Sequence, residues 1–321
     1  MAARRRLLVT GASGLLGGNV ALALCRDWEV VGTYAAHPFS LAGTVSRRLD
    51  IRSDGEVAAL FADIRPEVTV HCAAETRVDA CEARPDEAFA VNARAPGRLA
   101  RAARAAGSLF VHVSTDAVYA PGGAPHAESA PTGPVNAYAA SKLAGEEAVA
   151  EAGGECLIVR TNLFGWSGRA KRSLAEWALA RLEAGGEPLT GFTDAVFSPL
   201  LASDLARAIE ALVRAGARGV YNAGAADAVS KYAFLRLLCR EFGYPEDLVR
   251  PGRSGQTLAA RRPGDTSLDS SRAAALIGTS FFPPVAEAVR RLKKLRDAGV
   301  PGLLAGSLGR GPATSGPGGD A

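Results

Sequence analysis

The chain has 321 residues, of which 48% are hydrophobic and 22% charged, a composition that is typical of a folded globular protein and excludes extensive disorder. Its net charge of +4 comes mainly from arginines scattered in short groups, so we expect no nucleic-acid partner. No stretch approaches the roughly 18 apolar residues of a membrane span. The apolar stretch after the arginine-rich start is broken by Gly11 and Gly14, which does not fit a signal peptide. We therefore expect a cytoplasmic protein without membrane segments.

The five cysteines are odd in number, and they have neither CxxC spacing nor a nearby histidine. This pattern favours neither disulfides nor zinc. Because the sequence offers no other ligand cluster, we predict no metal site.

Short apolar runs alternate with helical patterns through the first half of the chain. The predicted strands cover residues 6–10, 29–34, 45–49, 68–72, 109–114 and 157–161. The predicted helices cover residues 15–25, 55–63, 95–106 and 137–151. This alternation predicts an α/β protein with a Rossmann-type, doubly wound parallel sheet covered by helices on both faces.

The regular alternation ends near residue 165. We expect residues 1–165 to form the sheet domain and residues 166–299 mainly a smaller C-terminal lobe, with some segments returning to the core. Short elements are predicted there at 219–222 and 231–242, followed by a last helix whose apolar face carries Ala286, Val289, Leu292 and Leu295. Residues 300–321 are rich in Gly, Pro, Ser and Ala, so we expect a disordered tail.

A glycine-rich loop joins the first predicted strand to the first helix. Residues 10–17 read TGASGLLG, with glycines at Gly11, Gly14 and Gly17. These glycines permit a tight turn and a close backbone approach, and the helix N-terminus offers free N–H groups to a pyrophosphate. Because the loop lies between a strand and a helix, we predict that residues 1–165 form an NAD(P)-binding domain.

The end of the second predicted strand indicates which cofactor is preferred. An acidic residue there would bind the ribose hydroxyls of NAD and repel a 2′-phosphate, but residues 30–37 read VVGTYAAH. NADP(H) is therefore favoured over NAD(H), with His37, Arg47 or Arg48 near the phosphate. The alternative for each of the three is an exposed loop charge.

Two other strand ends carry residues suited to the cofactor. After the third strand, Asp50 could accept a hydrogen bond from the adenine amino group while Ile51 packs on the ring; a helix N-cap is the alternative for Asp50. After the fourth strand, Ala73 and Ala74 are small enough for the cofactor to pass close by, or they serve only in packing. Both strand ends are therefore candidate borders of the cofactor site.

The sequence YAASK at 138–142 carries the predicted acid–base chemistry. Tyr138 and Lys142 are four residues apart on one helix face, so an ammonium can lie close to the phenol and favour its ionised form. An ordinary phenol, with a pKa of about 10, would be a sluggish proton donor near neutrality. Thr115 ends the fifth strand and could hydrogen-bond the same reacting oxygen. We predict that these three residues form the catalytic group.

From residue 6 to about 297 the chain resembles the extended short-chain dehydrogenases/reductases, and more narrowly the dTDP-4-dehydrorhamnose reductase group, also called RmlD-like. Besides TGASGLLG and YAASK, the segments that carry the resemblance are CAAETRVDACE at 72–82, VNARAP at 91–96, STDAVY at 114–119, SKLAGE at 141–146, VRTNLFG at 159–165 and RRPGDTSLDSS at 261–271.

The resemblance implies a role for each matching position. The implied cofactor contacts are Gly14, Leu15 and Leu16 at the pyrophosphate, Asp50 and Ile51 at the adenine, and Ala73, Ala74 and Glu75 on the nicotinamide side. Tyr138 would be the proton donor and Lys142 would hold the nicotinamide ribose. Thr115 and Asp116 would meet the sugar. The implied reaction is the NAD(P)H-dependent reduction of a 4-keto-deoxysugar nucleotide, with hydride from the nicotinamide.

The chain also departs from related patterns. Dehydratases of the wider family typically have an Asp-Glu pair after the threonine, whereas Ala117 follows Asp116 here, which argues against dehydration. An aromatic residue, often Trp, is usual in the reductases at the position of Leu163, and its loss weakens the assignment to that one substrate. Trp166 could compensate for it, although a core or lobe-interface position is the better prediction.

Two other functions remain open from the sequence. One is a non-catalytic NADP-binding regulatory subunit, similar to that of methionine adenosyltransferase, and the other is a sugar-nucleotide epimerase or decarboxylase. Arg261 or Arg262 is expected either to bind a phosphate or to pair with Asp265. A homodimer is the default expectation, because dimers are the commonest oligomers.

Overall fold

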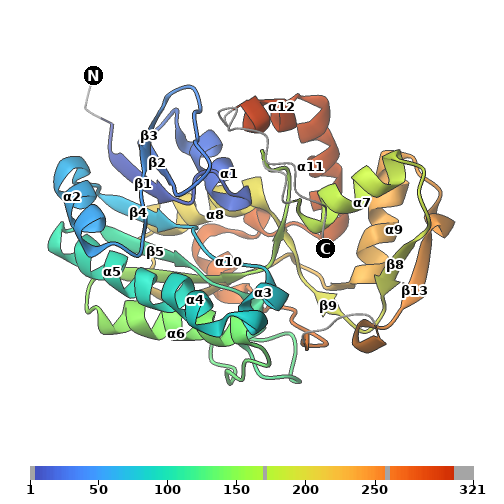
Figure 1. The fold of residues 1–321 in the computed structure, drawn as a ribbon. Helices are drawn as coiled ribbons and strands as arrows, with labels where there is room; N and C mark the ends of the chain where they lie inside the picture. The colour runs from blue at the N-terminus through green and yellow to red at the C-terminus, as the bar shows by residue number, and fades with distance from the viewer. Residues whose placement is uncertain (1–3, 169–171, 257–260, 307–321) are drawn as a thin grey trace.

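A seven-stranded parallel sheet forms the centre of the protein (Figure 1). The structure is a computed structural model that describes residues 4–168, 172–256 and 261–306. From edge to edge the strands are β11 (Gly219–Ala223), β6 (Cys156–Thr161), β5 (Leu109–Val113), β4 (Val68–His71), β1 (Arg6–Thr10), β2 (Glu29–Tyr34) and β3 (Thr44–Arg48). Strand order reverses between β1 and β4, and ligands of such sheets bind at the carboxyl ends beside this reversal. The predicted Rossmann-type fold is confirmed.

Helices cover both faces of the sheet (Figure 1). One face packs against α1 (Leu15–Leu24), α8 (Ala202–Arg214) and α10 (Ser271–Ile277). The other face packs against α2 (Asp54–Ile64), α5 (Ala95–Ala105) and α6 (Ala137–Glu151). Leu7, Leu8 and Val9 of β1 are at most 1% exposed, because a central strand is buried on both faces and therefore appears in the sequence as a continuous apolar run.

A smaller lobe, at the right of Figure 1, has its own apolar core. Its main elements are α7 (Leu174–Glu183), β8 (Leu189–Phe192), α9 (Lys231–Phe242), β13 (Val249–Gly252) and α11 (Val285–Asp297). Two short strand pairs join it to the core: β7 (Leu163–Phe164) with β10 (Leu200–Leu201), and β9 (Val196–Phe197) with β12 (Val229–Ser230). Between these segments the chain returns to the main sheet as α8 and β11.

Two expectations for the C-terminal region are wrong. Ala286 is exposed, and the buried face of α11 begins with Val285 and Ala288 instead. The expected disordered tail starts as a helix, α12 (Val300–Gly306), in which Leu304 is only 2% exposed. A Cβ at Gly18 of α1 would lie 3.4 Å from Leu304, so α12 gains order by packing on α1. Residues 307–321 lie outside the described residues.

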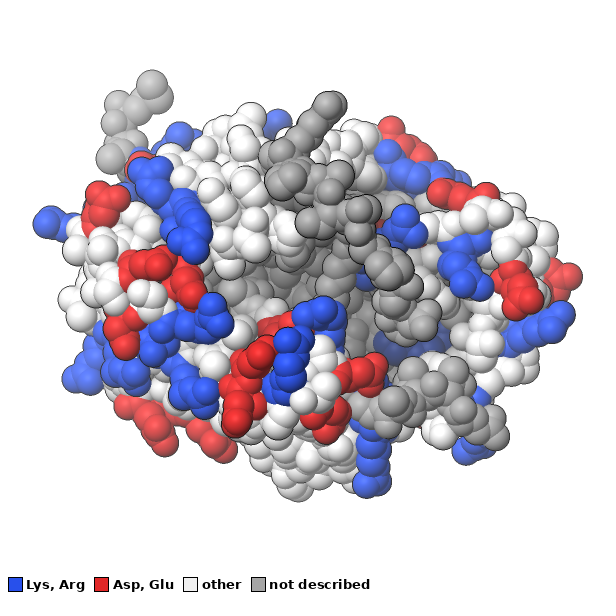
Figure 2. All heavy atoms as spheres, viewed as in Figure 1, with Lys and Arg blue, Asp and Glu red and all other residues white. Residues whose placement is uncertain are grey.

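The surface in Figure 2 carries interspersed acidic and basic side chains, and the basic ones do not gather into a single stripe on this face. Among the described residues, no helix combines the length and apolarity that crossing a membrane requires. These ranges also contain no group of three or more His, Cys, Asp and Glu side chains placed to hold a metal ion.

Candidate active site

The glycine-rich loop lies at the carboxyl end of β1, beside the reversal of strand order. Gly11 has a φ of +69°, and a Cβ there would lie 2.8 Å from the Cα of Ala73. A Cβ on Gly17 would clash with the carbonyl oxygen of Gly11. The backbone of β1, the start of α1 and the end of β4 therefore meet at distances that only glycine allows.

The N-terminus of α1 is suited to a phosphate group. Its N-cap, Gly14, makes no side-chain capping hydrogen bond, so the first-turn N–H groups of Leu15, Leu16 and Gly17 have no side-chain acceptor there. Ala73 lies against Gly11, and Ala74 follows it at the same sheet edge. These residues are chemically suited to a dinucleotide cofactor, whose pyrophosphate the free N–H groups at the start of α1 could bind.

The predicted adenine-side residues have additional partners in the fold. Asp50 forms an ion pair with Arg52 at 2.8 Å and accepts a hydrogen bond from the Arg52 backbone N–H, and these contacts lower its pKa to about 2. Asp50 is not the N-cap of α2, because Ser53 has that position and accepts a hydrogen bond from the Glu56 backbone. Ile51 is half-buried against the apolar core under α2.

The arginines considered for a 2′-phosphate lie on β3, beside the end of β2. The parallel register places Arg47 opposite Thr33 and Arg48 opposite Tyr34. Both side chains are exposed, and the only ion pair of Arg48 among the described residues is with Glu56, at 3.9 Å. His37 lies exposed in the loop after β2.

The three predicted catalytic residues converge at the carboxyl end of β5. Thr115 directly follows this strand, and its hydroxyl interacts with the Tyr138 phenol. Tyr138 is in the first turn of α6, a helix whose N-cap Asn136 accepts a hydrogen bond from the Ala139 N–H at 2.8 Å. Lys142 follows one turn later on the same helix.

The prediction that the Lys142 ammonium favours the ionised form of Tyr138 is wrong. Burial raises the pKa of Tyr138 above its usual value, and the charge of Asp116 raises it further, while the hydrogen bond with Thr115 partly opposes the shift. The Lys142 ammonium instead donates to the carbonyl oxygen of Val113 at 2.8 Å. Tyr138 therefore keeps its proton at neutral pH, so the phenol could act as a proton donor there.

Lys142 lies over two buried histidines. Its Nζ is 3.4 Å from Nε2 of His112, whose ring stacks on His71 with centroids 5.5 Å apart. Burial lowers the pKa of both imidazoles, to about 3 for His71, so they are neutral and do not repel the ammonium. Burial also lowers the pKa of Lys142, to about 8, against the opposing charge of Glu146.

Asn92 fixes the position of α6. It lies in a π-helical turn (Ala90–Arg94) between α4 (Pro85–Phe89) and α5. Its side chain exchanges two hydrogen bonds with the backbone of Glu75, both 2.9 Å, and donates a third to Ser141 Oγ at 3.0 Å. A Cβ on Gly145 would clash with the Asn92 carbonyl oxygen, so α6 lies directly on this turn.

Glu146 and Arg160 form a buried ion pair near Lys142. The side chains are 5% and 7% exposed, and the shortest distance between them is 2.6 Å. Ser114 donates a further hydrogen bond to Glu146, and the Arg160 guanidinium lies 4.8 Å from the centroid of the Tyr119 ring. Asn92 and Glu146 lie within the motifs at 91–96 and 141–146, but the sequence does not indicate their partners. Each is a polar residue in an alanine-rich helical stretch, which is the one feature of the sequence that could have marked it as structurally important.

Asp116, which was expected to meet the sugar, is bound within the protein. One carboxylate oxygen accepts a hydrogen bond from Thr115 at 3.0 Å, and the other accepts from Asn162 at 2.9 Å and from Thr266 at 2.6 Å. Burial raises its pKa, and these three hydrogen bonds oppose the shift. Asp116 therefore joins β5 to two distant segments, while Thr115 remains beside Tyr138.

Arg262 and Glu75 each form an ion pair within the protein. Arg262 lies 3.4 Å from Asp79, not beside Asp265, which accepts hydrogen bonds from Ser267 instead. Glu75 forms an ion pair with Arg77 at 2.8 Å.

Trp166 belongs to the lobe core, where its Nε1 donates to the carbonyl oxygen of Leu292 at 2.9 Å and its ring meets Phe242. Trp166 therefore has the predicted core position. Leu163 is half-buried in β7.

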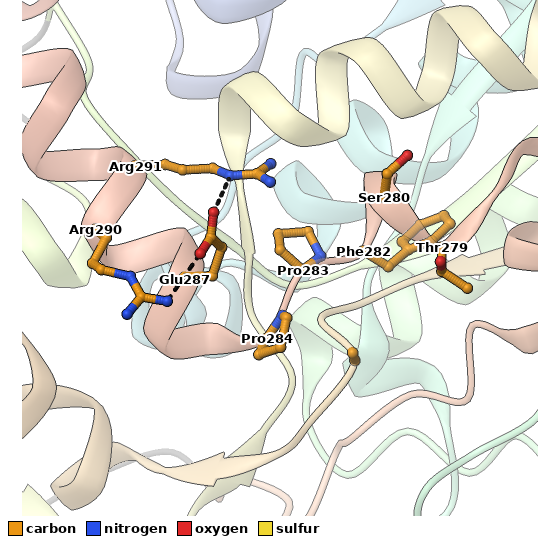
Figure 3. Close-up of a pocket in the computed structure, with 9 residues that line it drawn as sticks. Thr279, Ser280, Phe282, Pro283, Pro284, Glu287, Arg290 and Arg291 are labelled. Atoms are coloured by element: carbon orange, nitrogen blue, oxygen red, sulfur yellow. Dashed lines mark hydrogen bonds and ion pairs between the residues drawn. The ribbon is translucent and has the colours of Figure 1, made fainter.

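Two cavities lie away from this cluster. The larger one, of about 410 Å³, is lined by α11 and the segment before it, where Glu287 is hydrogen-bonded to Arg290 and Arg291 (Figure 3). The second, of about 310 Å³, lies next to it and shares Ala226, Thr279 and Phe282. Thr115, Tyr138 and Lys142 line neither of these two cavities.

Comparison with known proteins agrees with the fold and the motifs. A dTDP-4-dehydrorhamnose reductase of Mycobacterium tuberculosis is 35% identical over 279 residues, which cover 85% of this chain and 87% of that protein. The methionine adenosyltransferase 2 subunit beta of Bos taurus is 28% identical, over 84% and 81% of the two chains. The crystal structure of a dTDP-4-dehydrorhamnose reductase from Bacillus anthracis in complex with NADP superposes with a TM-score of 0.79 at 26% identity, covering 91% of this chain and 99% of that one. The sequence profile of the RmlD substrate binding domain matches residues 5–295, and the chain therefore belongs to this family.

Proposed function

We propose that this protein is a reductase that transfers a hydride from NADPH to the 4-keto group of a nucleotide-linked deoxysugar, with dTDP-4-dehydrorhamnose as the reference substrate. The observation that carries the proposal is the convergence of Thr115, Tyr138 and Lys142 beside the glycine-lined start of α1. Its relatives named dTDP-4-dehydrorhamnose reductase support the substrate class. Ala117, in place of a second carboxylate, supports reduction over dehydration.

Each of the three residues has a distinct role in this proposal. When bound, the nicotinamide supplies the hydride. Tyr138 donates its proton to the oxygen of the reduced carbonyl, and the Thr115 hydroxyl orients the phenol. Lys142 already donates one N–H to Val113, and another is available for the nicotinamide ribose. The pKa of Lys142, about 8, leaves this group mostly charged at pH 7.

NADPH is the proposed cofactor because the end of β2 has no acidic residue, and β3 places Arg47 and Arg48 beside it. A guanidinium suits the 2′-phosphate of NADPH, whereas an acid at this edge would repel it. The Bacillus anthracis reductase in complex with NADP supports the same choice.

The test is NADPH oxidation with dTDP-4-dehydrorhamnose. Tyr138→Phe removes the proton donor and should lower kcat by about 100- to 10,000-fold while the affinity for NADPH stays nearly unchanged. The matched control is Tyr244→Phe, which removes a phenol from the lobe and should retain wild-type turnover. Wild-type kcat in Tyr138→Phe would refute the mechanism.

The relationship to a methionine adenosyltransferase subunit favours one second candidate, a non-catalytic cofactor-binding subunit. In that case the purified protein would bind NADPH but oxidise none of it with any keto-sugar nucleotide, and Tyr138→Phe would change nothing. Turnover that depends on Tyr138 decides against this candidate.

A further inference from the structure

Lys231 is a half-buried lysine that the proposed mechanism does not use. It is the first residue of α9, and its backbone N–H donates to the Ala195 carbonyl at 2.8 Å, while Ser230 caps the helix. The ammonium lies 3.2 Å from the centroid of the Phe197 ring, and Phe197 is only 2% exposed. A capped helix and a buried ring therefore hold this cation in one place.

The fold brings Lys231 from the lobe to the side of the catalytic cluster. β9 and β12 pair so that Ser230 lies opposite Val196. The Thr266 hydroxyl lies 3.4 Å from the Val196 carbonyl and donates to the Asp116 carboxylate at 2.6 Å. Strand β9 runs on the side of the lobe that faces the sheet (Figure 1). Asp116 directly follows Thr115, so Lys231 lies near the reacting groups.

The Lys231 ammonium lacks a hydrogen-bond acceptor among the residues that the structure describes. Asp116 acts on it only through charge, because no ion pair closer than 4.0 Å joins the two groups and the Asp116 oxygens already accept from Thr115, Asn162 and Thr266. Lys142, by contrast, has the Val113 carbonyl. The Lys231 ammonium is partly desolvated, and the Phe197 ring beside it cannot accept a conventional hydrogen bond, so a ligand oxygen would supply an acceptor that the described residues do not.

We propose that Lys231 is a substrate-binding residue whose ammonium donates a hydrogen bond to an oxygen of the sugar part of the nucleotide sugar. This inference rests on the proposed function and adds a contact from the lobe. We assign the sugar rather than the diphosphate because the neighbours of Lys231 are Asp116 and, next to it, Thr115, which mark the reacting end of the site. Lys231 and Tyr138 then hold the sugar from the lobe and from the core.

Lys231→Met tests the proposal, because methionine keeps the length of the chain and removes the charge. We expect the KM for dTDP-4-dehydrorhamnose to rise about 10- to 100-fold, the loss typical of a hydrogen bond to a charged group, with the KM for NADPH unchanged. Titration calorimetry should show the same loss for dTDP-rhamnose and none for dTDP, which lacks the sugar. Lys231→Arg should recover part of the affinity, and Lys294→Met, on the exposed face of α11, is the matched control.

Several outcomes would overturn the inference. Unchanged binding of dTDP-rhamnose by Lys231→Met would mean that the ammonium serves only the fold, and an equal loss for dTDP would move the contact to the nucleotide. If Lys231→Met fails to fold, as judged by NADPH binding, Lys231→Gln replaces it in the same titrations. A wild-type protein that neither turns over the keto sugar nor binds dTDP-rhamnose would refute the proposed function, whereas a normal Lys231→Met in an active wild type refutes the Lys231 assignment alone.

Discussion

Gly145→Ala should damage both the stability and the catalysis of this protein. The added Cβ would clash with the backbone carbonyl oxygen of Asn92, which cannot rotate away as a side chain would. Helix α6 must therefore move by roughly 1 Å, and overpacking of this kind costs about 1–3 kcal/mol. Because α6 also carries Tyr138 and Lys142, a displacement of this size should lower kcat by about 100-fold.

Thermal unfolding and steady-state NADPH oxidation measure the two effects. We expect the Tm of Gly145→Ala to fall by roughly 2–6 °C. Gly55→Ala is the matched control, because a Cβ on this helical glycine of α2 would meet nothing within 4 Å, and the substitution should add about 0.4–1 kcal/mol of stability. A Gly145→Ala protein with wild-type Tm and kcat would refute the close packing of α6 on Asn92.

Three other predictions concern charge. Glu146→Gln leaves Arg160 buried without its partner and should cost about 3–5 kcal/mol in urea unfolding, whereas Glu67→Gln, which breaks a surface pair with Arg5, should cost at most about 1 kcal/mol. The pKa of Lys142 is about 8, so kcat should fall as the pH rises through this value and the ammonium loses its proton; a flat profile up to pH 10 would contradict this. Replacing Arg47 and Arg48 by alanine should raise the KM for NADPH about tenfold and leave that for NADH unchanged, and an equal change for both would argue against a phosphate contact.

The sequence predicts the central sheet well because buried strands and amphipathic helices leave local patterns. The strand at 29–34 and the helices at 137–151 and 231–242 have the predicted bounds. The glycine-rich loop and the Tyr138–Lys142 spacing are also short sequence patterns. Because the loop follows β1 and both residues lie in α6, the order of the strands and helices is enough to place them in the fold.

Properties that depend on distant contacts could not be predicted. The pKa of Tyr138 rises because of burial, and burial depends on segments far away in the sequence. The hydrogen bond from Thr266 to Asp116 joins residues 150 positions apart, so no local pattern could indicate it. The order of α12 depends on the contact of Leu304 with α1, while the local composition of that segment indicates disorder.

The position of β11 affects how this protein emerges from the ribosome. This strand completes the sheet beside β6, yet it ends at Ala223, after the first part of the lobe. About 60 residues separate it from the end of the predicted cofactor domain, which at 5–20 residues per second corresponds to roughly 3–12 s of synthesis. During this interval β6 is an open edge strand with unpaired backbone groups, the kind of edge at which chains aggregate. We therefore expect ribosome-associated chaperones to shield the edge of β6 mainly while residues 166–223 are being made.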